Sequence, residues 1–271
     1  MAVQLMDNDS QVDLKEVYAV IRDEGFSERT INVIDNYTYQ IINGKTNLTQ
    51  FNQEEHAGLC CAGEMLIGAY LVCNYAQASL AAGRDAGAGQ ADPAGPANWE
   101  IDEEQEKLVE QWAEAKRVWF PDAEADIESE YGQMIAQGAE AKVYYKDGDT
   151  SVVKMRTSIY ATLGRALESI VLHNALFHET PMSVIGFTRD ADGLFRSIST
   201  QPYIRCKRLA TKSEIDQMVA GKGFRDNHDG QGVNYIGERL HLEDMHPANV
   251  FVDTISDAPV CIDCIVKFIR R

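Results

Sequence analysis

Two acids and one amide in the C-terminal part of the chain have the types and spacing that metal binding and proton transfer require. Asp244 and Asn249 are five positions apart with Pro247 between them, so they share a short rigid loop and not a helix. Asp263 stands inside the apolar run 260–266, where a carboxylate is expensive to bury unless it is paired or holds a metal. The pattern predicts a hairpin whose second strand ends on Asp263 and which brings the three side chains together. Such a group forms an oxygen cage for Mg²⁺, with one acid left to accept a proton.

The stretch L-E-D-M-H-P-A-N at residues 242–249 resembles the H-R-D-x-x-x-x-N catalytic loop of protein kinases. Asp263, in the triplet I-D-C, lines up with the aspartate of the D-F-G motif. The Asp-x-His-Pro-x-Asn form is closer to aminoglycoside and choline kinases than to eukaryotic protein kinases. The C-terminal half resembles most closely the kinase-like domain of bacterial polyvalent proteins, which conjugative elements and phages carry.

This resemblance implies an α+β fold of the reduced protein-kinase-like type, with two lobes. An antiparallel sheet would form the N-lobe, and the C-lobe would be truncated. It also implies ATP and Mg²⁺ as cofactors and phosphoryl transfer to a hydroxyl acceptor. Asp244 would be the catalytic base, and Asn249 and Asp263 would hold the metal. The sequence names neither the acceptor, a small molecule or a protein, nor the oligomeric state.

A lysine and a glutamate supply the next part of the kinase pattern. Residues 151–155 are predicted to form a strand that carries Lys154 after two valines. In kinases this lysine holds the α- and β-phosphates and pairs with a glutamate on the following helix. The following helix is expected at residues 162–176, and its one acid is Glu168. The resemblance therefore makes both residues catalytic, and the alternative is that both are ordinary surface side chains.

Two segments are candidates for nucleotide contacts. Gly138 precedes a predicted strand at 142–145 and stands for a glycine loop, whose backbone amides could cradle phosphates. A predicted hairpin of strands 184–187 and 194–198 leads into the position of the kinase hinge, where backbone groups read the adenine edge. The hinge candidates are Gln201, Pro202, Tyr203 and Ile204.

Composition and periodicity divide the chain into three parts. Residues 12–80 have helical spacing, and residues 1–80 are predicted to form a helical N-terminal domain. Residues 81–98 are rich in Gly, Ala and Pro and are predicted to be a flexible linker. Residues 99–271 form the predicted kinase-like domain, which opens with a helix at 101–118.

The end of the kinase-like domain shows two further local patterns. Thr211 and Glu214 match a capping box that opens a helix, and Gly221 ends that helix. Residues 223–232 are polar and rich in turn formers, and we expect a loop there near the substrate. Seven residues follow Cys264, which leaves no room within this chain for an activation segment.

The pair C-x-x-C at Cys261 and Cys264 allows a rival interpretation as a zinc or redox site. On a strand, however, positions i and i+3 point to opposite faces, so the two sulfurs could not share an ion without a turn. A redox pair of the thioredoxin type stands at the start of a helix, and no helix is expected here. Core packing, with Cys264 beside the nucleotide, is therefore the favoured interpretation. A zinc site could also be suggested for the neighbouring polar cluster His241, Glu243, Asp244 and His246, and this interpretation is disfavoured as well.

Composition limits the function classes. The chain has 271 residues, of which 45% are hydrophobic, and a net charge of −17, which argues against a general nucleic-acid surface. No apolar run is long enough to span a bilayer, and the six cysteines suit a reducing compartment, so we expect a cytoplasmic protein of a bacterial mobile element. Two functions remain: an active phosphotransferase, or a nucleotide-binding pseudokinase that serves as an interaction module. The presence of all five polar positions favours the enzyme.

Overall fold

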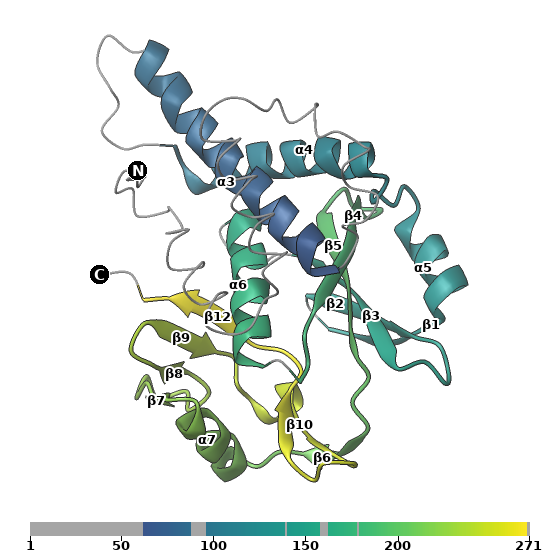
Figure 1. Cartoon of the computed structure of the whole chain (residues 1–271), viewed down its shortest axis with the longest axis vertical. Coiled ribbons are helices and arrows are strands. Elements are labelled where there is room, and N and C mark those ends of the chain that lie inside the picture. Colours follow the sequence, from purple (N-terminus) through teal and green to yellow (C-terminus); the bar gives the residue numbers. More distant parts are fainter. Residues whose placement is uncertain (1–61, 88–95, 139, 158–161, 178, 270–271) are drawn as a thin grey trace. The chain divides into compact units, whose positions relative to one another are not determined.

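The computed structural model describes residues 62–87, 96–138, 140–157, 162–177 and 179–269 (Figure 1). The chain divides into two compact units, which are described separately here. Of the described residues, unit 1 comprises those up to Gly148 together with those in Val152–Leu167 and Ser183–Thr200. Unit 2 comprises the described residues of Asp149–Ser151, of Glu168–Met182 and from Gln201 onward. Both units combine helices with antiparallel sheet, so the predicted α+β class is confirmed.

Unit 1 contains a five-stranded sheet in the order β1-β2-β3-β5-β4. Its strands are β1 (Gln133–Gln137), β2 (Ala141–Tyr145), β3 (Ser151–Thr157), β4 (Ser183–Arg189) and β5 (Phe195–Pro202). The four strands expected from the sequence are confirmed as β2 to β5. Strand β1 was not predicted, because it lies at the sheet edge with every residue exposed and a bulge at Met134–Ala136, so its sequence lacks alternation.

Three helices accompany this sheet. Helix α5 (Ala123–Tyr131) inserts Ile127 into a core that also contains Tyr144, Met155 and Ile198 from the sheet. Helix α3 (Ala62–Gly87) packs against α4 (Asn98–Lys116), and both contact β4 (Figure 1). The contact between α3 and α4 is so close that a Cβ added at Gly68 would lie 2.8 Å from the indole ring of Trp112. None of the described helices is both long and apolar enough to cross a membrane.

The structure modifies the predicted linker. Helix α3 continues to Gly87, so residues 81–87 are helical. Alanine is the strongest helix former, and its abundance here supports the helix even though Gly and Ala together resemble linker composition. Residues 1–61 and 88–95 lie outside the described part, so the division into domains 1–80 and 99–271 stays a prediction. The helix expected at 101–118 is confirmed as α4, which ends at Arg117 in a left-handed cap with φ 59°.

Helix α6 (Leu163–Leu176) begins in unit 1 and carries Glu168 and His173 into unit 2. Side chains of α4 satisfy its first backbone N–H groups. The Asp102 carboxylate accepts from the Leu163 N–H at 2.6 Å, and the amide oxygen of the buried Gln105 accepts from the Gly164 N–H at 2.8 Å. These tertiary contacts cap the helix, because the first four N–H groups have no partner inside it.

Unit 2 contains two small antiparallel sheets in the orders β11-β10-β6 and β12-β9-β8-β7. The elements are β6 (Cys206–Leu209), α7 (Lys212–Gly221), β7 (Arg225–Asp226), β8 (Tyr235–Ile236), β9 (Leu240–Glu243), the 3₁₀ turn η2 (Pro247–Asn249), β10 (Val250–Asp253), β11 (Pro259–Cys261) and β12 (Ile265–Phe268). The buried Ser169 of α6 accepts from the Val266 N–H at 2.9 Å, which ties β12 to that helix.

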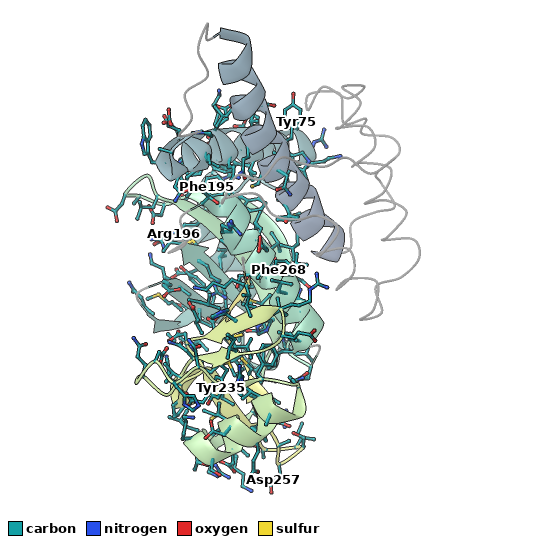
Figure 2. All side chains as sticks on the ribbon, turned by 90° about the vertical axis from the view of Figure 1, so that its left-hand side faces the viewer. Tyr75, Phe195, Arg196, Tyr235, Asp257 and Phe268 are labelled. Atoms are coloured by element: carbon teal, nitrogen blue, oxygen red, sulfur yellow. The ribbon has the colours of Figure 1, made fainter. Side chains whose placement is uncertain are left out.

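Helix α7 begins with the predicted capping box. The Thr211 hydroxyl accepts from the Glu214 N–H at 3.3 Å, and the Glu214 carboxylate accepts from the Thr211 N–H at 2.8 Å. Tyr235 of β8, labelled in Figure 2, is tied to the same helix: its hydroxyl donates to the Asp216 carboxylate at 2.7 Å and accepts from Lys212 at 3.0 Å. These contacts fix α7 against the β7–β8 hairpin.

We predict that the Asp102 cap matters through hydrogen-bond acceptance and not through charge. Asp102→Ala should lower the free energy of unfolding by about 0.5–2 kcal/mol, as cap removal does. Asp102→Asn keeps an acceptor for the Leu163 N–H and should retain most of the stability. Urea denaturation at neutral pH measures both variants, with the exposed Glu103→Ala as the control. Equal stability of the Ala and Asn variants would contradict this role.

The same residue gives a pH dependence of known sign. Burial raises the pKa of Asp102, and the hydrogen bond from the Leu163 N–H opposes that rise. The folded state therefore keeps this proton to higher pH than the unfolded chain, so the contribution of Asp102 to stability falls as pH rises from the unfolded to the folded pKa. Asp102→Asn should remove this decline, which unfolding curves recorded across that interval will show.

Candidate active site

Asp244 and Asn249 lie together in the loop after β9. The Asn249 Nδ2 group donates to the Asp244 backbone carbonyl at 2.9 Å and to its carboxylate Oδ2, also at 2.9 Å. Asn249 ends the turn η2, which Pro247 starts, so the loop is short and rigid as the sequence indicated. Because Nδ2 is directed at Asp244, the amide oxygen of Asn249 points away from that carboxylate.

His246 is the second side chain that orients the Asp244 carboxylate. Its Nδ1 accepts from the Ala248 N–H at 3.2 Å, so the ring proton belongs on Nε2. Nε2 lies 3.4 Å from Asp244 Oδ1 and 3.3 Å from Asn249 Nδ2. Each carboxylate oxygen therefore faces a different neighbour, while 46% of the Asp244 side chain remains exposed. From the sequence, His246 was considered only as part of a disfavoured zinc cluster and was given no role toward Asp244; its position just before Pro247, as the cap of η2, was the available signal.

The backbone of Asp244 is in the left-handed region, with φ +64°. This conformation costs about 1–2 kcal/mol for most residues other than glycine, and Asp tolerates it better because its short side chain can hydrogen-bond locally. The Asp244 N–H donates to Asn234 Oδ1 at 3.2 Å, and the Met245 N–H donates to the Val233 carbonyl at 2.9 Å. These two hydrogen bonds attach Asp244 and Met245 to Val233 and Asn234, which precede β9 in the chain.

Val233 and Asn234 directly follow the turn-rich segment 223–232, which is hydrogen-bonded to Asn234. Asp229 accepts from the Asn234 side chain and from the Gln231 N–H, and these hydrogen bonds lower the pKa of Asp229. The segment expected to lie near the substrate is thus linked, through Asn234, to the backbone of Asp244.

Asp263 is positioned by two strand pairings. In the β10–β11 hairpin Val250 pairs with Cys261, and the Ile262 N–H extends the ladder by donating to the Asn249 carbonyl at 2.9 Å. On the other side of the bend, Ile265 of β12 pairs with Glu243 of β9. The chain neighbours of Asp263 are therefore attached to the elements that carry Asn249 and Asp244.

The local structure around Asp263 differs from the prediction of one strand that ends on the acid. Strand β11 ends at Cys261, two residues earlier, and Asp263 lies in a bend before β12. The bend forms because residues 259–261 pair with β10 whereas residues 265–268 pair with β9, in the other sheet. A single apolar run in the sequence contains both strands, which is why the break between them was missed.

Lys154 and Glu168 are both buried. Lys154 lies on β3 with 6% of its surface exposed, and Glu168 lies on α6 with 1% exposed. The interpretation as surface side chains is therefore excluded, and burial of a charged group requires compensation by other polar groups. The two residues belong to different units, so their ion pair stays a prediction.

Several groups of the predicted nucleotide-binding residues already form hydrogen bonds within the protein. Gly138 is exposed in the turn between β1 and β2, and its N–H donates to the Ala141 carbonyl at 2.8 Å. Pro202 has no N–H, and the N–H of Tyr203 donates to the Thr150 carbonyl at 2.9 Å. The side chain of Gln201 is buried and donates to the Thr180 carbonyl at 2.8 Å. Reading of an adenine edge here would fall to other backbone groups of the segment, such as those of Ile204.

The two cysteines that flank this site also depart from expectation. The argument that Cys261 and Cys264 point to opposite faces assumed an unbroken strand, and the bend after Cys261 removes that assumption. Both side chains are buried, and Cys264 Sγ lies 3.4 Å from Nδ1 of the buried His173.

Comparison with known protein families gives a match to a kinase family. A family model described as serine/threonine/tyrosine kinase found in polyvalent proteins matches residues 102–270. The match begins in α4 and includes the sheet of unit 1 and all of the loop and hairpin elements described above. No curated protein and no solved structure matches the chain significantly. Since the matched segment covers more than half of the sequence, the chain belongs to the family of serine/threonine/tyrosine kinases found in polyvalent proteins.

Proposed function

We propose that the chain is an ATP- and Mg²⁺-dependent phosphotransferase that acts on a hydroxyl acceptor. The observation that carries this proposal is the pair of hydrogen bonds from the Asn249 amide to Asp244, next to the bend that bears Asp263. The Asp244 carboxylate is oriented and partly exposed. The amide oxygen of Asn249 and the second acid, Asp263, belong to adjoining segments of the chain. Membership of a kinase family supports this use of the three residues.

In this proposal Asp244 is the catalytic base. Its carboxylate is oriented by His246 at Oδ1 and by Asn249 at Oδ2, and an ionised carboxylate has further lone pairs for an acceptor hydroxyl. Asp244 accepts the hydroxyl proton as the acceptor oxygen bonds to the γ-phosphorus, and the bond from that phosphorus to the bridging oxygen breaks to release ADP. The loop at residues 244–249 contributes by positioning the Asp244 carboxylate.

The proposed metal ligands are oxygen donors of the kind that Mg²⁺ binds. This cation prefers oxygen ligands and is usually bound by one or two carboxylates together with substrate phosphates. The Asp263 carboxylate and the Asn249 amide oxygen are the proposed ligands, because the amide nitrogen of Asn249 is already used toward Asp244. When bound, the ion would neutralise charge on the phosphates.

Lys154 and Glu168 are the proposed positioning pair for the α- and β-phosphates. Their burial supports this role, since a lysine and a glutamate are rarely buried unless they are paired. Gly138 and the backbone of residues 201–204 are the proposed contacts to the rest of the nucleotide.

We also place the protein in the cytoplasm of a bacterium and its gene on a mobile element. The family description, which names polyvalent proteins, supports the second point. The net charge of −17 argues against nucleic acid as the acceptor, so a small molecule or a protein hydroxyl is proposed.

The different roles of the two acids give the first functional prediction. Asp244→Asn should leave Mg²⁺-dependent ATP affinity nearly unchanged, while turnover falls by about 10²–10⁴ through loss of the base. Asp263→Asn should abolish Mg²⁺-dependent ATP binding, because a metal ligand is lost. Calorimetry measures binding, and consumption of γ-labelled ATP measures turnover.

Asp257→Asn is the matched control for both variants. Asp257 is an exposed acid in the β10–β11 turn with φ 53°, a conformation that Asn also accepts, and its contact is a surface ion pair with Lys207. It should behave like the parent protein. Unchanged turnover in Asp244→Asn would contradict the catalytic role, and nucleotide binding by a parent protein that shows no turnover with a broad panel of hydroxyl acceptors would identify a pseudokinase.

A second prediction concerns the buried lysine. Lys154→Met keeps a side chain of similar length but removes a charged hydrogen-bond donor, which is worth about 1.5–3 kcal/mol, or a tenfold to hundredfold loss in ATP affinity or turnover. Lys142→Met on the neighbouring strand β2 is the control, because Lys142 forms a surface ion pair with Glu124. Equal nucleotide affinity and equal turnover in both variants and the parent would remove Lys154 from the site.

A further inference from the structure

Three buried side chains of unit 2 bring two sulfur atoms and one ring nitrogen together. His173 and Cys261 are fully buried, and Cys264 is 4% exposed. The two Sγ atoms and a nitrogen of His173 all lie within 4.8 Å of one another. Within the described part of the chain, no other group of three or more His, Cys, Asp or Glu side chains converges in this way.

The histidine ring is held with one lone pair directed at the cysteines. Its Nε2 lies 3.1 Å from the Thr180 carbonyl oxygen, which can only accept, so Nε2 carries the proton. Nδ1 is then unprotonated and lies 3.4 Å from Cys264 Sγ. A metal-binding histidine almost always donates its other N–H to a carbonyl or carboxylate in this manner. Thr180 is itself fixed, because its carbonyl also accepts from Gln201 at 2.8 Å and its hydroxyl donates to the Cys261 carbonyl.

We propose that His173, Cys261 and Cys264 form a binding site for a thiophilic divalent cation, namely Zn²⁺. Two thiolates and a neutral imidazole balance the charge of a divalent ion, so the buried complex would have no net charge, whereas an unbalanced buried charge is strongly unfavourable. A tetrahedral Zn²⁺ with its usual bond lengths separates sulfur and nitrogen ligands by about 3.5–3.8 Å. The Nδ1–Sγ distance of 3.4 Å is already close to that value.

Three protein ligands leave one position of a tetrahedral ion to be filled. Two groups border the cluster on the side of Cys261: Met245 Sδ lies 3.8 Å from Cys261 Sγ, and the Asp263 carbonyl accepts from the Cys261 thiol at 3.1 Å. Loss of the thiol proton on metal binding releases that carbonyl, which makes it a candidate for the fourth position.

The proposed site does not depend on phosphotransfer activity. Cys261 and Cys264 bracket the bend that bears Asp263, and Met245 follows Asp244 in the chain. An ion bound to both sulfurs and to α6 would cross-link this bend to the helix and would stabilise unit 2 with or without nucleotide. Simple core packing would instead leave a neutral S–H···N hydrogen bond with no affinity for metal.

The test uses the untagged full chain, reduced and stripped of metal, titrated with Zn²⁺ in competition with a chromophoric chelator. We expect one tightly bound Zn²⁺ per chain and a higher thermal unfolding midpoint in its presence. Cys261→Ser and Cys264→Ser should each weaken binding by more than about 100-fold, since loss of an outer-shell partner alone costs 10–100-fold. Cys206→Ser is the control, because Cys206 is exposed on β6 and should not matter.

Two results would overturn the proposal: no stoichiometric Zn²⁺ binding by the parent protein, or binding that neither serine variant weakens. A variant that fails to fold does not remove the test, because X-ray absorption of the parent complex identifies the elements of the ligand atoms directly. The expected first shell contains two sulfur atoms and at least one nitrogen. A shell of nitrogen and oxygen alone would contradict the assignment.

Discussion

The hydrogen bonds from the Asn249 amide to Asp244 are the interaction on which the candidate site depends. A single Nδ2 group binds both the backbone carbonyl and the carboxylate of Asp244, so it fixes the position and the orientation of the acid together. It does so at a residue with φ +64°, a left-handed conformation that few residues other than Gly, Asn and Asp adopt. The strain at this residue is offset by these bonds and by the N–H bond to Asn234. The same geometry directs the amide oxygen of Asn249 away from the Asp244 carboxylate.

The bend at residues 262–264 is the second constraint, and it links the candidate site to the cysteine cluster. Its two ends belong to different sheets, since Cys261 pairs with Val250 and Ile265 pairs with Glu243. The chain must therefore turn between them, which presents the Asp263 region at the end of the hairpin and brings the two sulfurs to the same side, against His173. One local break in a ladder thus accounts for both arrangements.

Features set by neighbouring residues could be predicted from the sequence. The Asp244–Asn249 loop contains its own proline, and the Thr211–Glu214 capping box satisfies its own N–H groups. The short apolar run around Lys154 forms β3, as its composition indicated. The family resemblance added the expectation that these pieces belong to one kinase-like fold, which the match over residues 102–270 supports.

What could not be predicted depends on distant partners. Strand β1 has no buried face, so only its pairing with β2 reveals it. The break between β11 and β12 follows from pairing with two different sheets, and the cap of α6 comes from Asp102, 61 positions earlier in the chain. The orientation of His246 toward Asp244 likewise appears only when the loop is folded.

The most direct test of the proposed site is a crystal structure of the chain with Mn²⁺ in place of Mg²⁺ and a non-hydrolysable ATP analogue. Anomalous scattering will locate the ion. The account predicts that the metal binds the Asp263 carboxylate and the Asn249 amide oxygen at about 2.0–2.2 Å, while Asn249 Nδ2 remains bonded to Asp244. A metal bound to neither Asn249 nor Asp263, with the nucleotide phosphates elsewhere, would contradict it.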